Sequence, residues 1–101
     1  MASSCAFVYI VRCSDGTFYT GYAVDLERRL RAHNLGRGAR YTSGRRPVSL
    51  IYAVACTSKS EALKRERQIK RWSRAKKAEL ARLGPDIRHA TSARTRRRAA
   101  R

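Results

Sequence analysis

Residues 6–22, which read AFVYIVRCSDGTFYTGY, decide the fold. β-Branched and aromatic side chains fill the runs 6–12 and 17–22, and this composition is typical of strands. The Ser-Asp-Gly sequence at 14–16 between them is a turn signal. The stretch therefore predicts a β-hairpin.

The length of the hairpin loop decides whether two tyrosines can act together. A two-residue turn would place Tyr9 and Tyr19 on opposite faces of the sheet, because side chains alternate along a strand. A three-residue loop with Gly16 in the left-handed region would pair Val11 with Tyr19. The same register puts Gly21 opposite Tyr9 and leaves open space over that ring. We predict the three-residue loop, in which the two rings are diagonal neighbours within about 7–8 Å.

The next elements alternate between helix and strand. Asp25 is a predicted N-cap, and the helix that it starts ends between Asn34 and Gly38. Residues 37–47 (RGARYTSGRRP) predict a basic, glycine-containing loop. The apolar run at 48–56 predicts a mostly buried third strand.

Two further helices are expected in the second half of the chain. Residues 58–61 (SKSE) have the spacing of a capping box at a helix start. Ser73 is predicted to cap a last helix with Leu80 and Leu83 facing inward, and the Gly-Pro pair at 84–85 ends it. The order β-β-α-β-α-α predicts an α+β fold with a small three-stranded antiparallel sheet flanked by helices.

The composition indicates one domain and a polyanionic partner. The chain has 101 residues, of which 43% are hydrophobic, and this suffices for one modest core. Lys and Arg total 24 against 7 Asp and Glu, which gives a formal net charge of +17. Such a surplus makes nucleic acid the first candidate partner. No segment combines the length and apolarity needed to enter a membrane, so a membrane partner is not expected.

The positive charge is unevenly distributed along the chain. No acid occurs between Glu27 and Glu61, whereas that interval carries many arginines. Residues 1–85 are expected to form the folded domain. Residues 86–101 contain six arginines and one acid, and they are expected to be a disordered basic tail.

The cysteines indicate a reducing compartment. Cys5, Cys13 and Cys56 match no zinc-ligand spacing, and an odd number argues against a complete set of disulfides. The N-terminus lacks the basic region of a signal peptide. We therefore expect a cytoplasmic protein with reduced thiols.

Arg29 and His33 lie four residues apart and share one face of the first predicted helix. Together they could clamp a phosphate, because Arg offers two parallel donors to a phosphoryl group and stays charged. Arg29 could instead pair with Asp25, and His33 could be a half-buried helix residue with one satisfied nitrogen. These alternatives remain open at the level of the sequence.

Glu66 interrupts the apolar stripe of the predicted helix that starts near residue 59. It is flanked at helical spacing by Ala62, Leu63 and Ile69. A carboxylate in such a stripe must be paired, protonated or bound to a cation. Lys70 is one candidate partner. A divalent cation held by one carboxylate, water and substrate phosphate, as is typical of magnesium, is the other.

The basic loop mixes a tyrosine with several cations. Its arginines suit contact with a nucleic-acid backbone, and its tyrosine suits stacking on exposed bases. An exposed loop with no specific role would explain the same composition. The predicted DNA-binding residues are Arg28, Arg37, Arg40, Tyr41, Arg45, Arg46 and Lys70.

Several short motifs occur in a fixed order along residues 6–83. They are Val8-Tyr9-Ile10, Tyr19-Thr20-Gly21, the helix with Arg29 and His33, and the later helix with Glu66. Together these residues resemble the GIY-YIG nuclease family. The chain is similar to its small single-domain bacterial members and to the nuclease subunit of structure-specific junction endonucleases.

The resemblance implies a metal-dependent endonuclease that acts on DNA in repair or recombination. It gives catalytic roles to Tyr9, Tyr19, Arg29 and His33, and it makes Glu66 the ligand of one divalent cation, Mg²⁺ or Mn²⁺. Tyr9 would act on the attacking water. A free phenol has a pKa of about 10, so nearby cations are expected to favour the ionised form of Tyr9.

The chain also departs from the family pattern. Val8 stands where the first motif has glycine, and Tyr22 stands where the excision-repair branch carries a lysine thought to assist catalysis. His33 would then substitute for that lysine. Without a separate specificity domain, the protein would choose DNA by shape, such as branched or flapped DNA, or through a protein partner. Two alternatives remain: a non-catalytic nucleic-acid-binding module, and a nuclease subunit active only with a partner.

Overall fold

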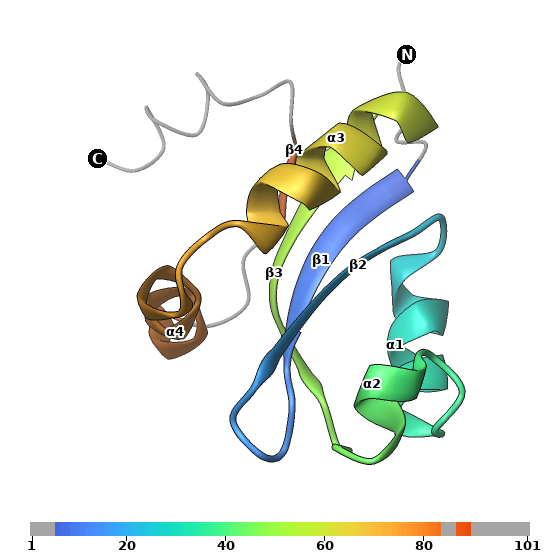
Figure 1. Cartoon of the computed structure of the whole chain (residues 1–101). Helices are drawn as coiled ribbons and strands as arrows, with labels where there is room; N and C mark the ends of the chain where they lie inside the picture. Colours follow the sequence, from blue (N-terminus) through green and yellow to red (C-terminus); the bar gives the residue numbers. More distant parts are fainter. Residues whose placement is uncertain (1–5, 84–86, 90–101) are drawn as a thin grey trace.

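A twisted sheet with helices on both sides forms the framework of the protein (Figure 1). The computed structural model describes residues 6–83 and 87–89. The strands are β1 (Ala6–Arg12), β2 (Phe18–Ala23), β3 (Ser49–Cys56) and β4 (Ile87–His89), in the spatial order β2-β1-β3-β4. β2, β1 and β3 are antiparallel neighbours, whereas β4 pairs in parallel with β3. The predicted α+β fold with a three-stranded antiparallel sheet is confirmed, and β4 extends it.

The hairpin adopts the predicted three-residue loop. Val11 pairs with Tyr19, and Tyr9 pairs with Gly21. Gly16 has a φ of 86°, and the loop closes with a 2.8 Å bond in which Cys13 N donates to the carbonyl oxygen of residue 17. In this register, both tyrosines lie on the same face of the sheet.

Four helices complete the described part of the chain. They are α1 (Leu26–Asn34), α2 (Arg40–Ser43), α3 (Lys59–Lys70) and α4 (Arg74–Leu83). The three predicted N-caps are confirmed: the side chains of Asp25, Ser58 and Ser73 each accept a backbone N–H three residues later, at 3.0 Å. These bonds satisfy amide groups that a helix start leaves without a partner.

Each face of the sheet carries its own apolar core. Val8 and Ile10 pack with Ala62 and Ile69 of α3 on one face. Tyr9 and its neighbours on the other face pack with Leu26 of α1. In Figure 1, α3 and α4 accordingly lie on one side of the sheet, and α1 and α2 on the other. Alternation along β1 thus places the Tyr9 face under α1.

Three predictions from the sequence need correction. The loop predicted at 37–47 contains α2, a single turn too short to show helical periodicity. Residues 87–89, expected to lie in a disordered tail, form β4, because the edge of β3 offers unpaired backbone groups. Leu83 does not face inward: it is 69% exposed at the end of α4, although Leu80 packs on the core. The rest of the predicted tail lies outside the described residues.

The cysteines of the described chain lie in these cores. Cys13 and Cys56 are buried free thiols, as expected of small apolar side chains, whereas Cys5 lies outside the described residues. No helix within residues 6–83 is long and apolar enough to cross a membrane.

Candidate functional site

Three aromatic rings converge on the α1 face of the sheet. The hydroxyl of Tyr9 lies 2.7 Å from Nε2 of His33. The ring centroids of Tyr9 and Tyr19 are 6.5 Å apart, and those of Tyr19 and His33 are 5.4 Å apart. Two residues of the hairpin and one of α1 therefore form a single cluster. The imidazole is fully buried, so one sequence-level expectation, a half-buried helix histidine, is wrong.

The partners of His33 determine its tautomer. The hydroxyl of Thr42, in α2, donates to the carbonyl oxygen of Ala39 at 3.1 Å. With its only proton in that bond, the Thr42 oxygen accepts from Nδ1 of His33, 2.8 Å away. Nδ1 thus carries the ring proton, and Nε2 offers its lone pair to the O–H of Tyr9. The result is a donor chain that runs from Tyr9 through His33 and Thr42 to a backbone carbonyl.

Two glycines make room for this donor chain. A Cβ atom on Gly38 would lie 2.2 Å from Nδ1 of His33, and one on Gly21 would lie 2.7 Å from the hydroxyl of Tyr9. Both distances are far below van der Waals contact. The space expected over Tyr9 therefore exists because residue 21 lacks a side chain, but the phenol of Tyr9 itself fills it. Neither Gly38 nor Thr42 was singled out from the sequence, since nothing in its local pattern indicates contact with a histidine.

Burial governs the proton affinity of the Tyr9–His33 pair. Burial, followed by the neighbouring Tyr19, raises the pKa of Tyr9 to about 12, although Arg29 acts in the opposite direction. The expectation that nearby cations would favour the phenolate is therefore wrong for the free protein. Burial, followed by the Arg29 charge, lowers the pKa of His33 below 6.5. At neutral pH the phenol keeps its proton and the imidazole is uncharged.

Arg29 lies beside this pair. It sits one turn before His33 on α1, and its charge acts on both Tyr9 and His33. Its side chain lines a cavity of about 270 Å³ together with Asp25 and Arg28. The guanidinium is thus placed to meet an anion that approaches the Tyr9 hydroxyl.

Glu66 approaches the site from the other side of the sheet. Burial is the main cause of the raised pKa of Tyr9, and the Glu66 carboxylate adds to it, so the two groups lie within electrostatic range of each other. Oε2 of Glu66 lies 3.2 Å from Nζ of Lys70, but the lysine side chain is 56% exposed. The Glu66 side chain itself is 18% exposed, so the pair reaches solvent mainly on its lysine side, where water weakens it.

The donor set around Glu66 fits only one kind of metal site. No group of three or more His, Cys, Asp or Glu side chains that could hold a metal occurs within residues 6–83 and 87–89. Mg²⁺ is commonly bound through one or two carboxylates, with water and substrate phosphate filling the other positions. The single, partly exposed carboxylate of Glu66 meets that requirement.

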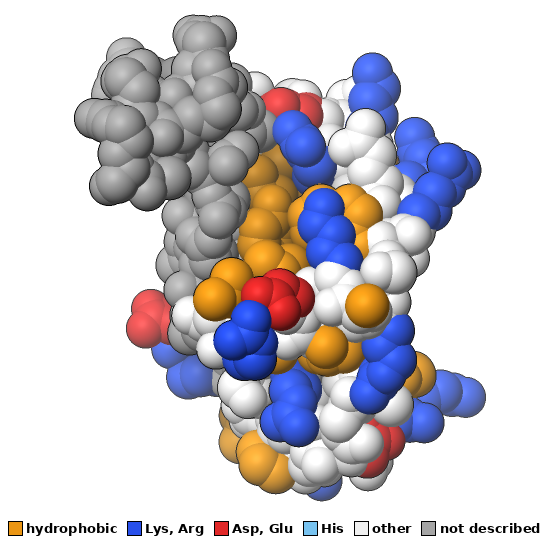
Figure 2. All heavy atoms as spheres, turned by 90° about the vertical axis from the view of Figure 1, so that its left-hand side faces the viewer, with side chains coloured by type: hydrophobic (Ala, Val, Ile, Leu, Met, Phe, Trp, Pro, Cys, Tyr) orange, Lys and Arg blue, Asp and Glu red, His pale blue; other side chains and the backbone are white. Residues whose placement is uncertain are grey.

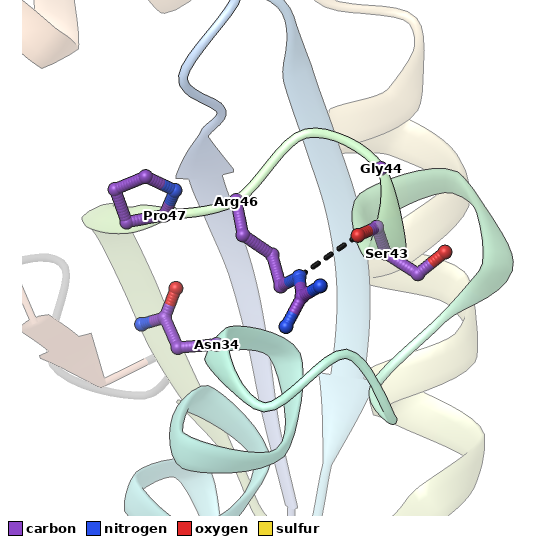
Figure 3. Close-up of a pocket in the computed structure, with 5 residues that line it drawn as sticks. All are labelled: Asn34, Ser43, Gly44, Arg46 and Pro47. Carbon is purple, nitrogen blue, oxygen red and sulfur yellow. Dashed lines mark hydrogen bonds between the residues drawn. The ribbon is translucent and has the colours of Figure 1, made fainter.

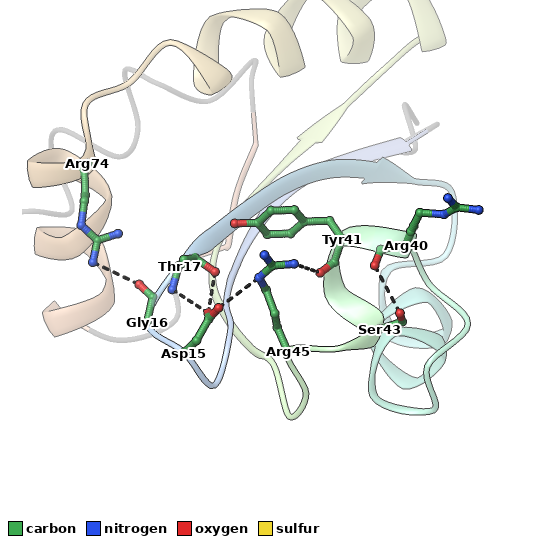
Figure 4. Close-up of polar contacts among 8 residues, drawn as sticks. All are labelled: Asp15, Gly16, Thr17, Arg40, Tyr41, Ser43, Arg45 and Arg74. Atoms are coloured by element: carbon green, nitrogen blue, oxygen red, sulfur yellow. Dashed lines mark hydrogen bonds and ion pairs between the residues drawn. The ribbon is translucent and has the colours of Figure 1, made fainter.

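Arg45 and Tyr41 lie side by side next to the hairpin loop (Figure 4). Tyr41 stacks on Tyr19 with ring centroids 5.8 Å apart. Nε of Arg45 donates to Asp15 at 3.0 Å, and its guanidinium lies 4.1 Å from the centre of the Tyr41 ring. These contacts connect α2 to the hairpin loop. Both side chains therefore have partners within the protein.

The other predicted DNA-binding residues lie at the protein surface. Arg46 donates from Nε to the carbonyl oxygen of Ser43 at 2.8 Å and lines a cavity of about 420 Å³ with Asn34 and Pro47 (Figure 3). Arg28, Arg37, Arg40 and Lys70 are all exposed. The structure thus gathers Tyr9, Tyr19, Arg29 and His33 on one face, places Glu66 within electrostatic range of Tyr9, and leaves the exposed cations around them.

Comparisons with known proteins agree with this arrangement. Residues 5–79 match the family model described as the GIY-YIG catalytic domain. The chain is 53% identical to UPF0213 protein HQ_3675A of Haloquadratum walsbyi, over 80% of this chain and 91% of the relative. It is 58% identical to a UPF0213 protein of Staphylococcus aureus strain Mu3, over 73% of this chain and 90% of that protein.

A solved structure supports the same assignment. The solution NMR structure of protein EF2693 from E. faecalis is similar, with 38% sequence identity and a TM-score of 0.51. The similarity covers 82% of this chain and 90% of that one. The match to the family model includes both strands of the hairpin and the helices that carry Arg29, His33 and Glu66. The chain therefore belongs to the GIY-YIG family.

Proposed function

We propose that this protein is a metal-dependent endonuclease that hydrolyses DNA phosphodiester bonds. The observation that carries the proposal is the 2.7 Å bond between the Tyr9 hydroxyl and Nε2 of His33 in a GIY-YIG catalytic domain, a domain that in general is a nuclease. The bond joins the buried phenol of Tyr9, which water would reach only once substrate binding opens the site, to a neutral imidazole that can accept a proton.

The donor chain defines how the attacking water would lose its proton. Water next to the Tyr9 oxygen donates its proton to that oxygen, while Tyr9 passes its own proton to Nε2 of His33. Thr42 keeps the other ring nitrogen protonated, so Nε2 is the acceptor. Tyr19, stacked at the same site, would position the water or a phosphate oxygen. Arg29 would stabilise the negative charge that develops on the phosphoryl group.

Glu66 would hold the divalent cation, Mg²⁺ or Mn²⁺. When bound, such a cation neutralises charge on the scissile phosphate and stabilises the leaving oxygen. The lysine that now pairs with Glu66 is more than half exposed and can turn to a DNA phosphate instead. This exchange would couple the release of the carboxylate to the arrival of substrate.

The exposed cations near the site would grip the DNA backbone without reading its sequence. Arg28, Arg37, Arg40 and Arg46 are the proposed contacts, with Arg45 and Tyr41 as the wall between the hairpin and α2. We propose a role in DNA repair or recombination in the cytoplasm. The same proposal includes branched or flapped DNA as the substrate and a protein partner that supplies specificity.

The test uses the purified full chain with duplex, flapped and branched DNA, in Mg²⁺, in Mn²⁺ and in a chelator. We expect cleavage that requires the cation and is abolished in Glu66→Gln with little loss of DNA affinity. Glu27→Gln is the matched control, because Glu27 is an exposed acid on α1 outside the site. It should cut like the wild type.

Other results would point elsewhere. Binding without cleavage under every condition would make the protein a nucleic-acid-binding module. Cleavage that appears only with cell extract, and is lost in Glu66→Gln, would make it a subunit that needs a partner. Equal cleavage by the wild type and Glu66→Gln would refute the proposed role of that carboxylate.

A further inference from the structure

A second basic groove lies on the α4 side of the hairpin. It has a volume of about 370 Å³ and runs between the hairpin and α4. Arg12, Phe18, Arg74 and Arg82 line it, with Gly16 and two alanines of α4. Phe18 packs on the core that α3 covers, whereas its neighbour Tyr19 belongs to the catalytic face. The groove and the Tyr9–His33 site therefore lie on opposite sides of the same hairpin.

The groove is electrostatically one-sided. Three guanidinium groups line it, and none of its lining residues is acidic. Two acids adjoin lining residues in sequence: Asp15 pairs with Arg45, and Glu79 pairs with Arg82. Arg12 and Arg74 are in no ion pair among the described residues and carry the excess charge of the groove. Figure 2 shows that Lys and Arg side chains are spread over this side of the molecule. An unbalanced set of guanidinium groups in an open groove favours a polyanion as ligand.

Arg74 is held in place before any ligand arrives. Nη2 of Arg74 donates to the carbonyl oxygen of Gly16 at 3.2 Å (Figure 4). Its guanidinium also lies 5.3 Å from the centre of the Phe18 ring. A guanidinium has five N–H donors, and the bond to Gly16 uses one of them. Because the side chain is already oriented, binding a phosphate requires little additional ordering.

Phosphate in a nucleic-acid backbone matches these features best. The groove is open and its polar groups are exposed cations, so it lacks the buried, converging polar groups of a small-molecule pocket. Planar guanidinium groups bind phosphate oxygens through two parallel hydrogen bonds. A second segment of the DNA cut at the catalytic face would supply such phosphates next to the hairpin.

We propose that this groove binds the backbone of a second DNA segment while the first segment lies at the catalytic face. The identity of the ligand rests on the proposed function, but its chemistry rests on the groove alone. Binding on both sides of the hairpin would favour branched or flapped DNA over linear duplex, because only a branched molecule presents two arms at one position. The contacts are to phosphate and carry no sequence preference.

The test compares the double variant Arg12→Gln/Arg74→Gln with the wild type in binding to branched and linear DNA of equal length. Fluorescence anisotropy in a chelator, over a salt series, measures binding without cleavage. Each phosphate contact contributes about 0.9 to the slope of log K against log salt. We expect the slope for branched DNA to fall by up to about 1.8 in the double variant, with a much smaller change on linear DNA.

The control is Arg31→Gln/Lys64→Gln, which removes two exposed cations outside the groove. It should keep the wild-type slope. Three outcomes would overturn the proposal. The groove variant could keep the wild-type slope on branched DNA, its slope could fall equally on branched and linear DNA, or the slope of the control variant could fall as much as that of the groove variant. Circular dichroism checks that both variants are folded. Because no cleavage is needed, a failure of the nuclease proposal would leave this test intact.

Discussion

The substitution Thr42→Val tests the donor chain on which the site depends. Thr42 is fully buried, accepts from Nδ1 of His33 at 2.8 Å, and donates to the carbonyl oxygen of Ala39 at 3.1 Å. Valine has nearly the same shape but no hydroxyl. The variant therefore removes one acceptor and one donor from a packed site while leaving its volume almost unchanged.

The magnitude follows from Nδ1–H of His33, which loses its partner, whereas the carbonyl oxygen of Ala39 still accepts from Ser43 N at 3.1 Å. A buried N–H or C=O left without a hydrogen bond costs about 1–3 kcal/mol. For a domain of this size each kcal/mol lowers Tm by about 4–8 °C, so we expect a fall of roughly 5–20 °C. The imidazole can reduce this loss by moving its proton to Nε2, but the hydroxyl of Tyr9 then loses its acceptor. We therefore expect a mixture of tautomers in place of the single Nδ1–H form.

Two measurements decide the outcome. Nitrogen-15 NMR of the imidazole reports which nitrogen of His33 carries the proton, and thermal unfolding reports the stability. Thr42→Ser keeps the hydroxyl and should retain the Nδ1–H tautomer, with a smaller loss of stability that comes from the missing methyl group. If Thr42→Val keeps both the tautomer and the wild-type Tm, the hydroxyl does not hold His33 and the assignment of the donor chain is wrong.

Three further predictions concern the same cluster. Gly38→Ala should destabilise the protein by roughly 1–3 kcal/mol or more through overpacking against His33, whereas Gly44→Ala, which would meet no atom within 4 Å, should be nearly neutral in urea unfolding. The pKa of His33 is lowered in the folded state, so the unfolded state binds a proton at a higher pH than the folded state does, and stability should fall as pH drops below 6.5. A pH series of unfolding curves measures this slope. Loss of the slope in His33→Gln would confirm the prediction, and an unchanged slope would contradict it. In single-turnover cleavage, Tyr9→Phe and His33→Ala should each cause a large loss and the double variant little more, and additive losses would show that the two residues act separately.

The framework of the protein could be predicted because it depends on local sequence. The register of the hairpin follows from the parity of a three-residue loop with Gly16 in the left-handed region. The N-caps Asp25, Ser58 and Ser73 were visible because their partners lie three residues away. Strand β4 was not predicted, since its pairing with β3 joins segments that are far apart in the chain.

The inner part of the site could not be predicted either, although its residues are close together in the chain, because their contacts depend on how α1 and α2 pack. His33, Thr42 and Gly38 meet only after α1 and α2 have packed on the sheet, and none of the three carries a local signal for the others. The pKa of Tyr9 shows a second limit. The sequence displays the charges that would lower this pKa, but not the burial that outweighs them.

The pKa values of the pair constrain how it could work. Burial raises the pKa of Tyr9 to about 12 and lowers the pKa of His33, so moving a proton from the resting phenol to the imidazole is strongly unfavourable. A free phenolate is therefore a poor starting base. In a concerted transfer, by contrast, Tyr9 gains the proton of water as it gives up its own, so its charge does not change.

The only group of the pair that changes charge in such a transfer is His33. Burial lowers the pKa of the imidazole, and the positive charge of Arg29 lowers it further, so Arg29 opposes that change in the free protein. A phosphate bound to Arg29 would offset this charge and raise the proton affinity of His33. Arg29, which would bind the scissile phosphate, would thus also keep the proton affinity of His33 low until that phosphate arrives. The Tyr9–His33 pair would then accept a proton from water only with substrate in place.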